Sequence, residues 1–201
     1  ANRNNKCVRT AILEKENQSD IGKTIMSVKN NYFWTEKAAL SDFIANGDML
    51  EITRIFGYEE AFGLRFADVA VRFADRAEAT EIELTIILDT LLDDRASLDE
   101  ERQNRLYEEL YAFYSQDCSN KAIIKQAIKQ DKHYNALQIK FANALTCHKA
   151  QGGDWQTVFI QQGFFSDDML DTEYFRWLYT AVTRAKEKLY LVNFAEDFFA
   201  D

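Results

Sequence analysis

The chain has 201 residues, of which 47% are hydrophobic and 28% are charged, as in an ordinary globular protein that is long enough to bury a core. Its 24 Lys and Arg against 33 Asp and Glu give a net charge of -9, which argues against a free-standing protein that wraps nucleic acid, because phosphate neutralisation needs clustered basic residues. No apolar run approaches the roughly 18 residues that span a bilayer and no signal peptide opens the chain, so we expect a cytoplasmic protein without membrane contact.

The first 96 residues contain one helical pattern followed by strand patterns. Residues 1–21 predict a short amphipathic helix, and because they lack an initiator Met, we expect a chain cut from a longer protein. Alternating apolar and polar residues then predict several short strands, with a turn at Asn46-Gly47-Asp48. These strands, "KTIMSVKNNYFW", "FIANGDMLEITRI", "GLRFADVAVRF" and "EIELTIIL", favour a small antiparallel β-barrel over residues 22–96.

From Ser97 the apolar period becomes helical. "SLDEERQNRLYEELYAFYS" predicts a helix with Ser97 and Glu100 as a capping box, and "NKAIIKQAIKQD" predicts a second one. "ALQIKFANALT" is typical of a buried strand, and the remaining chain predicts strand, helix and strand, as in parallel α/β packing. We therefore expect an α/β domain formed by residues 1–21 and 97–201, with the barrel of residues 22–96 inserted.

Two motifs imitate the phosphate and magnesium sites of nucleotide-binding proteins. Gly22-Lys23-Thr24 matches the end of a Walker A loop, but Asn17 stands where that loop needs Gly, so a turn entering the barrel is favoured. Asp89 follows an apolar run as a magnesium-binding Asp does, but the alternation before it favours a half-exposed barrel strand.

A nucleophile or a zinc site at Cys147 is also disfavoured. Cys147 and His148 are neighbours, and adjacent residues of a strand point to opposite faces. The three cysteines are far apart and His133 is the only other histidine, so a zinc site lacks ligands.

Two polar segments carry stronger signals. "ALTCHKAQGGDW" follows a predicted strand, and its paired glycines and its Thr, His and Lys side chains suit a phosphate or a sugar. Thr180, Thr183 and Arg184 lie at helical spacing, and such an arginine can stabilise charge on a transferring phosphoryl group. Taken singly, a polar turn and a charged helix face remain open alternatives.

Together these segments resemble helicase motifs. "ALTCHKAQGGDW" resembles motif V and "LYTAVTRAKEKLYLV" resembles motif VI of the superfamily-one DNA helicases, in the RecD-like and UvrD-like branch. "ANRNNKC" looks like the tail of motif IV, and the barrel is similar to the SH3-like insertion of RecD-like proteins. The resemblance implies a partial RecA-like second motor domain, of the P-loop NTPase type, with an inserted SH3-like antiparallel β-barrel.

The resemblance implies a role for each motif residue on the DNA side. Thr146 and His148 would touch the backbone of single-stranded DNA, with Lys149 nearby. Gln151 and Gly152 would couple the DNA track to the nucleotide cleft.

On the nucleotide side, Arg184 would be the arginine finger at the γ-phosphate of ATP, supported by Thr183 and Tyr179. Asp154 occupies the place near the ribose where the family usually has Glu.

The resemblance implies the C-terminal fragment of a bacterial, ATP-dependent DNA helicase of the exodeoxyribonuclease V alpha type, which moves along single-stranded DNA in repair and recombination. ATP and Mg²⁺ would be bound mainly by an N-terminal RecA-like domain of the same parent chain, and subunits of a nuclease complex are further candidate partners. Walker A and B motifs are missing from these 201 residues, so we expect the fragment alone to be inactive. The alternative is a non-catalytic module whose SH3-like barrel binds protein or DNA.

Overall fold

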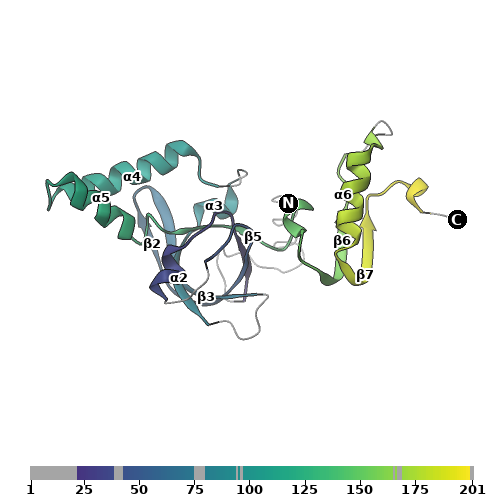
Figure 1. The fold of residues 1–201 in the computed structure, drawn as a ribbon, viewed down its shortest axis with the longest axis horizontal. Coiled ribbons are helices and arrows are strands. Elements are labelled where there is room, and N and C mark those ends of the chain that lie inside the picture. Colours follow the sequence, from purple (N-terminus) through teal and green to yellow (C-terminus); the bar gives the residue numbers. More distant parts are fainter. Residues whose placement is uncertain are drawn as a thin grey trace. The chain divides into compact units, whose positions relative to one another are not determined.

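The computed structural model describes residues 22–38, 43–74, 80–93, 95, 97–164, 166 and 169–199 (Figure 1). The predicted helix and motif IV tail of residues 1–21 lie outside this part of the chain. The chain divides into two compact units, residues 1–144 and residues 145–201, and each is described by itself. The fold is a mixed α/β fold that contains a closed five-stranded β-barrel.

The barrel belongs to the first unit. Its interior is filled by aliphatic side chains at alternate strand positions, for example Leu50 and Ile52, which are at most 1% exposed. The predicted turn at Asn46-Gly47-Asp48 is confirmed, with Gly47 at a φ of +104° and the Asp48 carboxylate accepting from the Ala45 amide at 2.8 Å. The strands close in the order β1 (Thr24–Ser27), β2 (Met49–Ala61), β3 (Leu64–Phe73), β4 (Ile82–Ile87) and β5 (Leu137–Phe141).

The fifth strand makes the barrel larger than residues 22–96. Strand β5 pairs antiparallel with β1 and parallel with β4, so the barrel is not antiparallel throughout. The Thr90 hydroxyl donates to the Ile87 carbonyl at 2.8 Å and accepts from the Ile139 amide at 3.1 Å, which ties β4 to β5. The apolar residues of β5 alternate with Gln138 and Lys140, but all five residues are buried, so this alternation does not mark a solvent-exposed face.

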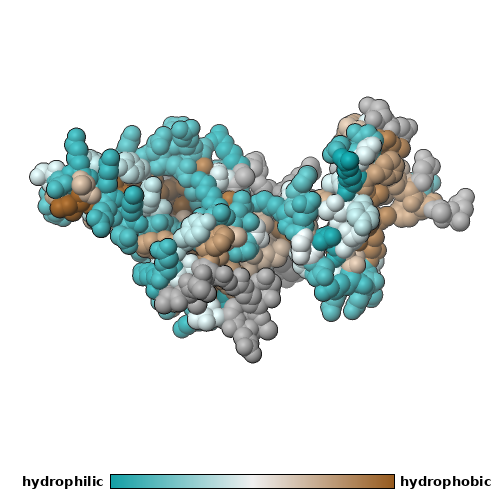
Figure 2. Space-filling view, viewed as in Figure 1, coloured by the Kyte–Doolittle hydropathy of each residue, from teal (hydrophilic) through white to brown (hydrophobic). Residues whose placement is uncertain are grey.

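Two helices cover the outside of the barrel, α4 (Glu100–Ser115) and α5 (Lys121–Gln130). Both are amphipathic, and their outward surfaces are mainly hydrophilic (Figure 2). The structure groups them with the barrel, which differs from the predicted domain of residues 97–201. The buried cluster that joins barrel and helices contains Leu64, Phe66, Ile87, Leu98, Leu106, Leu110, Ile124, Ile128 and Ala136.

Helix α4 is capped by Asp99, two residues after Ser97, the predicted N-cap. The Asp99 carboxylate accepts from the Arg102 amide at 2.8 Å, whereas the Ser97 hydroxyl donates to the Leu98 carbonyl at 3.4 Å. Asp is as good an N-cap as Ser, so the choice depends on where the chain turns into the helix. Two further short helices, α2 (Phe33–Lys37) and α3 (Asp89–Leu92), complete the first unit.

The two segments that resemble parts of a nucleotide-binding site are structural elements of the barrel. Gly22, with a φ of +79°, donates to the Ile52 carbonyl at 2.8 Å, and strand β1 begins at Thr24, so this segment is a turn into a strand as predicted. Asp89 accepts from the Arg65 amide at 2.7 Å and from its guanidinium at 3.1 Å. The strand before Asp89 was expected to be half exposed, but β4 has five of six residues buried, because helices cover its outer face.

A buried histidine lies between two carboxylates at the edge of the barrel. His133 Nε2 lies 3.1 Å from Glu59 Oε2, and Nδ1 lies 3.2 Å from Asp131 Oδ1. Burial alone would lower the pKa of His133, but the carboxylates of Asp131 and Glu59 outweigh it and raise the pKa above 6.5. Burial would raise the pKa of Asp131, but contacts with His133, Tyr114 and two backbone amides lower it to about 2.

These shifts predict a stability maximum in mildly acidic solution. The raised pKa of His133 contributes stability that is fully present below 6.5 and is lost as the pH rises through the folded-state pKa. The lowered pKa of Asp131 contributes stability that is present above 3.8 and is lost as the pH falls toward about 2. We expect His133→Gln to remove the decline of the unfolding free energy above pH 6.5, measured by urea unfolding. An unchanged decline in the variant would show that His133 is not its source.

The second unit is a strand, a helix and a strand, as predicted. Strands β6 (Trp155–Gln161) and β7 (Ala185–Val192) pair in parallel, and α6 (Thr172–Val182) connects them. Several large apolar side chains of this unit are exposed, among them Phe159 at 68% and Tyr179 at 71% (Figure 2). None of the helices that the structure describes is long and apolar enough to cross a bilayer. This unit also contains two short 3-10 segments, η2 (His148–Ala150) and η4 (Glu196–Phe198).

Candidate functional site

The first sequence-predicted segment forms a compact turn in the second unit. Strand β5 ends at Phe141, so Thr146 does not lie at the end of a strand as expected. Instead, the Thr146 carbonyl accepts from the Ala150 amide at 3.1 Å, and the His148 carbonyl accepts from the Gln151 amide at 3.3 Å. The turn continues through Gly152, whose φ of +85° favours glycine. We call residues 145–154 the polar turn.

The polar turn presents hydrogen-bonding side chains to solvent. Thr146, His148 and Gln151 are exposed, and Lys149 is half buried. Within the described part of the chain, none of these four side chains makes a hydrogen bond or an ion pair. A hydroxyl, an imidazole, an ammonium and an amide are therefore available to an external ligand, and they suit phosphate oxygens.

Cys147 is held as a thiol rather than as a nucleophilic thiolate. Its Sγ donates to the Trp177 carbonyl at 3.4 Å, and burial raises its pKa, which the charge of Arg184 offsets only in part. Cys147 and His148 do not lie on opposite faces of a strand as expected, because Cys147 directly precedes the 3-10 segment η2. The conclusion against a nucleophile is supported by the raised pKa instead.

The second sequence-predicted segment places an arginine at the end of α6. The Arg184 guanidinium donates through Nε to the Thr180 carbonyl at 3.0 Å and through Nη2 to the Thr183 hydroxyl at 3.0 Å. The Thr183 hydroxyl in turn donates to the Tyr179 carbonyl at 2.9 Å. The guanidinium is half buried. With a third hydrogen bond from Nη1 to the Gly153 carbonyl, its direction is fixed, and two of its five N–H groups are left for a ligand.

The structure brings the two segments together at Arg184 and Gly153. Arg184 Nη1 donates to the Gly153 carbonyl at 3.0 Å, and the Trp155 amide donates to the Arg184 carbonyl at 2.8 Å. The Trp155 ring lies against Gly153, so a Cβ at position 153 would come within 2.6 Å of it. A glycine is thus required at position 153, where the polar turn meets Arg184. These two residues are 31 positions apart in the sequence.

Two residues of this site had not been predicted. Trp155 fixes Gly153 through ring packing, and Lys186 forms an ion pair with Asp154, with 2.9 Å between Nζ and Oδ1. Both side chains of that pair are more than half exposed, so it is worth little in stability. Both residues are brought to the site by the parallel register of β6 and β7, which pairs Trp155 with Ala185 and which local sequence spacing does not predict.

The described residues fit only part of a nucleotide site. Arg184 offers a positive charge that suits a phosphate, while the carboxylate of Asp154 is paired with Lys186. No group of three or more His, Cys, Asp and Glu side chains in the described ranges could hold a metal ion.

Comparison with known proteins identifies the same region. Residues 141–192 match the family model of the UvrD-like helicase C-terminal domain, a span that contains the polar turn, α6 and β7. This match supports the interpretation of these residues as part of the C-terminal region of a superfamily-one helicase. No curated protein matches the chain.

Proposed function

We propose that this chain is the C-terminal part of an ATP-dependent DNA helicase that couples ATP hydrolysis to movement along single-stranded DNA. The observation that carries the proposal is the hydrogen bond of 3.0 Å between Arg184 Nη1 and the Gly153 carbonyl. It connects a cation suited to a phosphoryl group with a turn whose free side chains suit a nucleic-acid backbone. The match of residues 141–192 to a helicase C-terminal domain supports the same function.

In this proposal, Arg184 stabilises negative charge on the transferring γ-phosphoryl group of ATP. Thr183 and the Thr180 carbonyl orient the guanidinium, which lowers the cost of placing it in the transition state. ATP hydrolysis supplies the free energy for movement, and the ligands of Mg²⁺ come mainly from an N-terminal RecA-like domain of the parent chain. Asp154, if released from Lys186, is the candidate partner of the nucleotide ribose.

The polar turn forms the DNA side of the proposed site. Thr146, His148 and Lys149 donate to backbone phosphates of single-stranded DNA. Gln151 and Gly152 lie between these residues and the Gly153 carbonyl, so a displacement of Arg184 is transmitted along a short stretch of backbone. The exposed apolar side chains on β6 and β7 support the further proposal that these strands belong to a larger RecA-like sheet, since parallel sheets are covered on both faces.

The pathway is the finer part of the proposal. The five-stranded barrel fits the SH3-like type, which favours a RecD-like helicase of DNA repair and recombination, with nuclease-complex subunits as partners. This kinship rests on the sequence resemblance and on fold analogy.

We expect the purified 201-residue chain to show no ATP turnover, with or without single-stranded DNA, because it lacks Walker A and B motifs. Release of inorganic phosphate measures this directly. Turnover that is stimulated by DNA and abolished by Arg184→Ala would contradict the assignment of half a site to this chain.

In the parent helicase, His148→Ala is expected to raise the concentration of single-stranded DNA needed for half-maximal ATPase stimulation about fivefold, the effect of losing roughly one hydrogen bond. The maximal turnover should change little. Gln156→Ala, an exposed polar residue of β6 outside the polar turn, is the matched control. Equal behaviour of both variants would remove His148 from the DNA-binding surface.

A further inference from the structure

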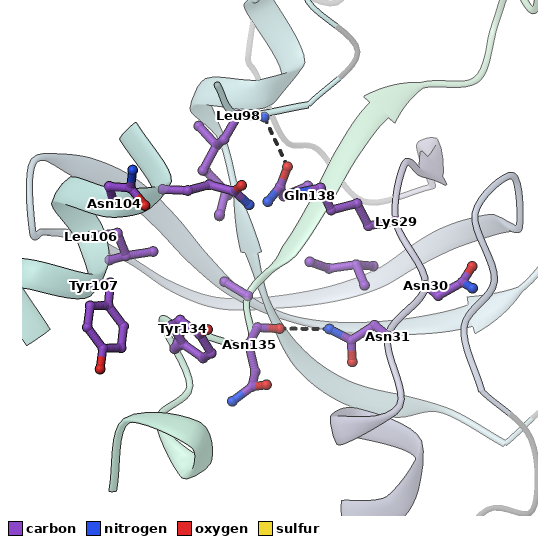
Figure 3. A pocket seen from close by; sticks show the side chains of 14 residues that line it. Lys29, Asn30, Asn31, Leu98, Asn104, Leu106, Tyr107, Tyr134, Asn135 and Gln138 are labelled. Carbon is purple, nitrogen blue, oxygen red and sulfur yellow. Dashed lines mark hydrogen bonds between the residues drawn. The ribbon is translucent and has the colours of Figure 1, made fainter. Parts of the chain in front are cut away.

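A hollow of about 550 Å³ lies in the first unit, between the barrel and α4 (Figure 3). Three chain segments surround it: residues 29–31 after β1, residues 103–107 of α4, and residues 134–138 at the start of β5. Its volume is in the range of small-ligand sites. Its floor is apolar, formed by Ile87, Leu98, Leu106, Ala136 and Leu137.

The walls of this hollow are preformed. The Asn135 carbonyl accepts from Asn31 Nδ2 at 2.9 Å and from Trp34 Nε1 at 2.8 Å, which joins the segment before β5 to the segment after β1. Gln138 Oε1 accepts from the Leu98 amide at 3.0 Å on the opposite wall. A ligand would therefore meet a site whose segments are already fixed, at a low ordering cost.

Several polar side chains of the lining are available to form hydrogen bonds with a ligand. Among the described residues, the side chains of Gln103, Asn104, Tyr107 and Tyr134 make no hydrogen bond. Tyr107 and Tyr134 form an aromatic corner with ring centroids 6.3 Å apart and planes at 63°. Aromatic faces beside free amides are the elements that hold an unstacked nucleobase.

The charge of the hollow differs from that of the chain. Lys29 is the sole charged residue among the 14 that line it, and no carboxylate does. Its ammonium makes no ion pair within the described ranges, and partial burial lowers its pKa. Figure 3 shows Lys29 on the side of the hollow opposite Tyr107 and Tyr134. In a chain of net charge -9, this is a local site that attracts an anion.

We propose that this hollow binds one nucleotide unit of a single-stranded nucleic acid. The base lies against Tyr107 and Tyr134, and the amides of Gln103 and Asn104 meet its edge. Lys29 pairs with the phosphate. Such binding would be a second contact with the nucleic acid, beyond the proposed function, and it is inferred from the geometry of the hollow alone.

An extended peptide fits this hollow less well. Peptides that bind β-structures commonly add a strand to an exposed sheet edge. The five strands form a closed barrel, and the hollow lies against a helix, so its lining offers side chains rather than a free strand edge. An aromatic corner opposite a single cation matches a base and its phosphate.

The test is a titration of the ¹⁵N-labelled 201-residue chain with thymidine, thymidine monophosphate and a four-residue oligothymidylate. The indole N–H of Trp34 donates to the Asn135 carbonyl in the wall and is the reporter signal. We expect Tyr134→Leu to weaken binding of all three probes about tenfold, since stacking contributes on that scale. Lys29→Gln should weaken the two phosphate-bearing probes about fivefold and leave thymidine unchanged.

Two variants serve as matched controls, Tyr58→Leu and Lys125→Gln, because both residues are exposed and neither lines the hollow. An unshifted Trp34 signal, or equal weakening by the controls, would overturn the proposal. So would binding of a neutral peptide at this signal without binding of nucleotides. Tighter binding of the oligonucleotide than of the mononucleotide is expected, and equal affinity would assign the hollow to free nucleotides instead. None of these outcomes depends on ATP turnover, which tests Arg184 separately.

Discussion

Arg184→Ala in the parent helicase is expected to lower kcat for ATP hydrolysis by a factor of about 10³ or more, as loss of an arginine finger does. The physical reason is the loss of a fixed positive charge where negative charge develops in the transition state. Binding of single-stranded DNA should change little in the absence of nucleotide, because the free side chains of the polar turn remain. Steady-state phosphate release and fluorescence anisotropy with labelled DNA measure the two quantities.

Arg176→Ala is the matched control for this change. Arg176 lies on α6, the helix that ends two residues before Arg184, and forms an exposed ion pair with Glu173, with 2.8 Å between Nη1 and Oε1. Its loss should leave ATP turnover within about twofold of the wild type, since exposed ion pairs contribute little. If Arg184→Ala and Arg176→Ala had equal turnover, Arg184 would be a charged residue of a helix end and not an arginine finger.

Leu110→Ala is expected to lower the free energy of unfolding by about 3 kcal/mol, within the range for a buried leucine. Leu110 on α4 is 0% exposed and belongs to the cluster that joins α4 and α5 to Phe66 and Ile87 of the barrel. Removing its side chain leaves a cavity between helices and barrel, so both should lose stability together. Urea unfolding followed by circular dichroism and by the indole N–H signal of Trp34 in the ¹⁵N-labelled chain measures this.

Ile123→Ala on α5 is the control for Leu110→Ala, because Ile123 is 56% exposed and does not belong to that cluster. Its effect should stay below about 1 kcal/mol. If Leu110→Ala unfolded the helices but left the Trp34 signal unchanged, the helices would form a unit separate from the barrel. That outcome would favour the boundary at residue 96 that the sequence suggested.

The apolar periodicity of the sequence predicts the individual helices and strands of this chain better than it predicts which of them pack or pair with one another. The strands β1 to β4 follow from apolar spacing because their alternate residues fill the barrel interior, and α4 and α5 follow from it because their apolar faces pack in the cluster on the outside of the barrel. Strand β5 is buried on both faces, and its sequence fits an α/β sheet as well as a barrel. Only the pairing with β1 and β4 decides between them, and such long-range pairing is not encoded in local spacing.

The sequence singles out candidate side chains, but it does not predict the contact between their segments. Thr146, His148 and Arg184 are recognised by residue type and order, and the structure places their segments in one unit. The bond from Arg184 to the Gly153 carbonyl was not foreseen, because a backbone acceptor has no signature in the sequence. The hollow could not be predicted from the sequence either, because its lining comes from several segments that are distant along the chain.

The central claim is that Arg184 and the polar turn form one coupled site. The most direct test measures the affinity of the parent helicase for single-stranded DNA with and without a non-hydrolysable ATP analogue. We predict that the analogue changes this affinity by about fivefold or more in the wild type, a typical coupling, and that Arg184→Ala removes the change. A variant that keeps the full nucleotide-dependent change in DNA affinity would contradict the coupling through Arg184 and Gly153.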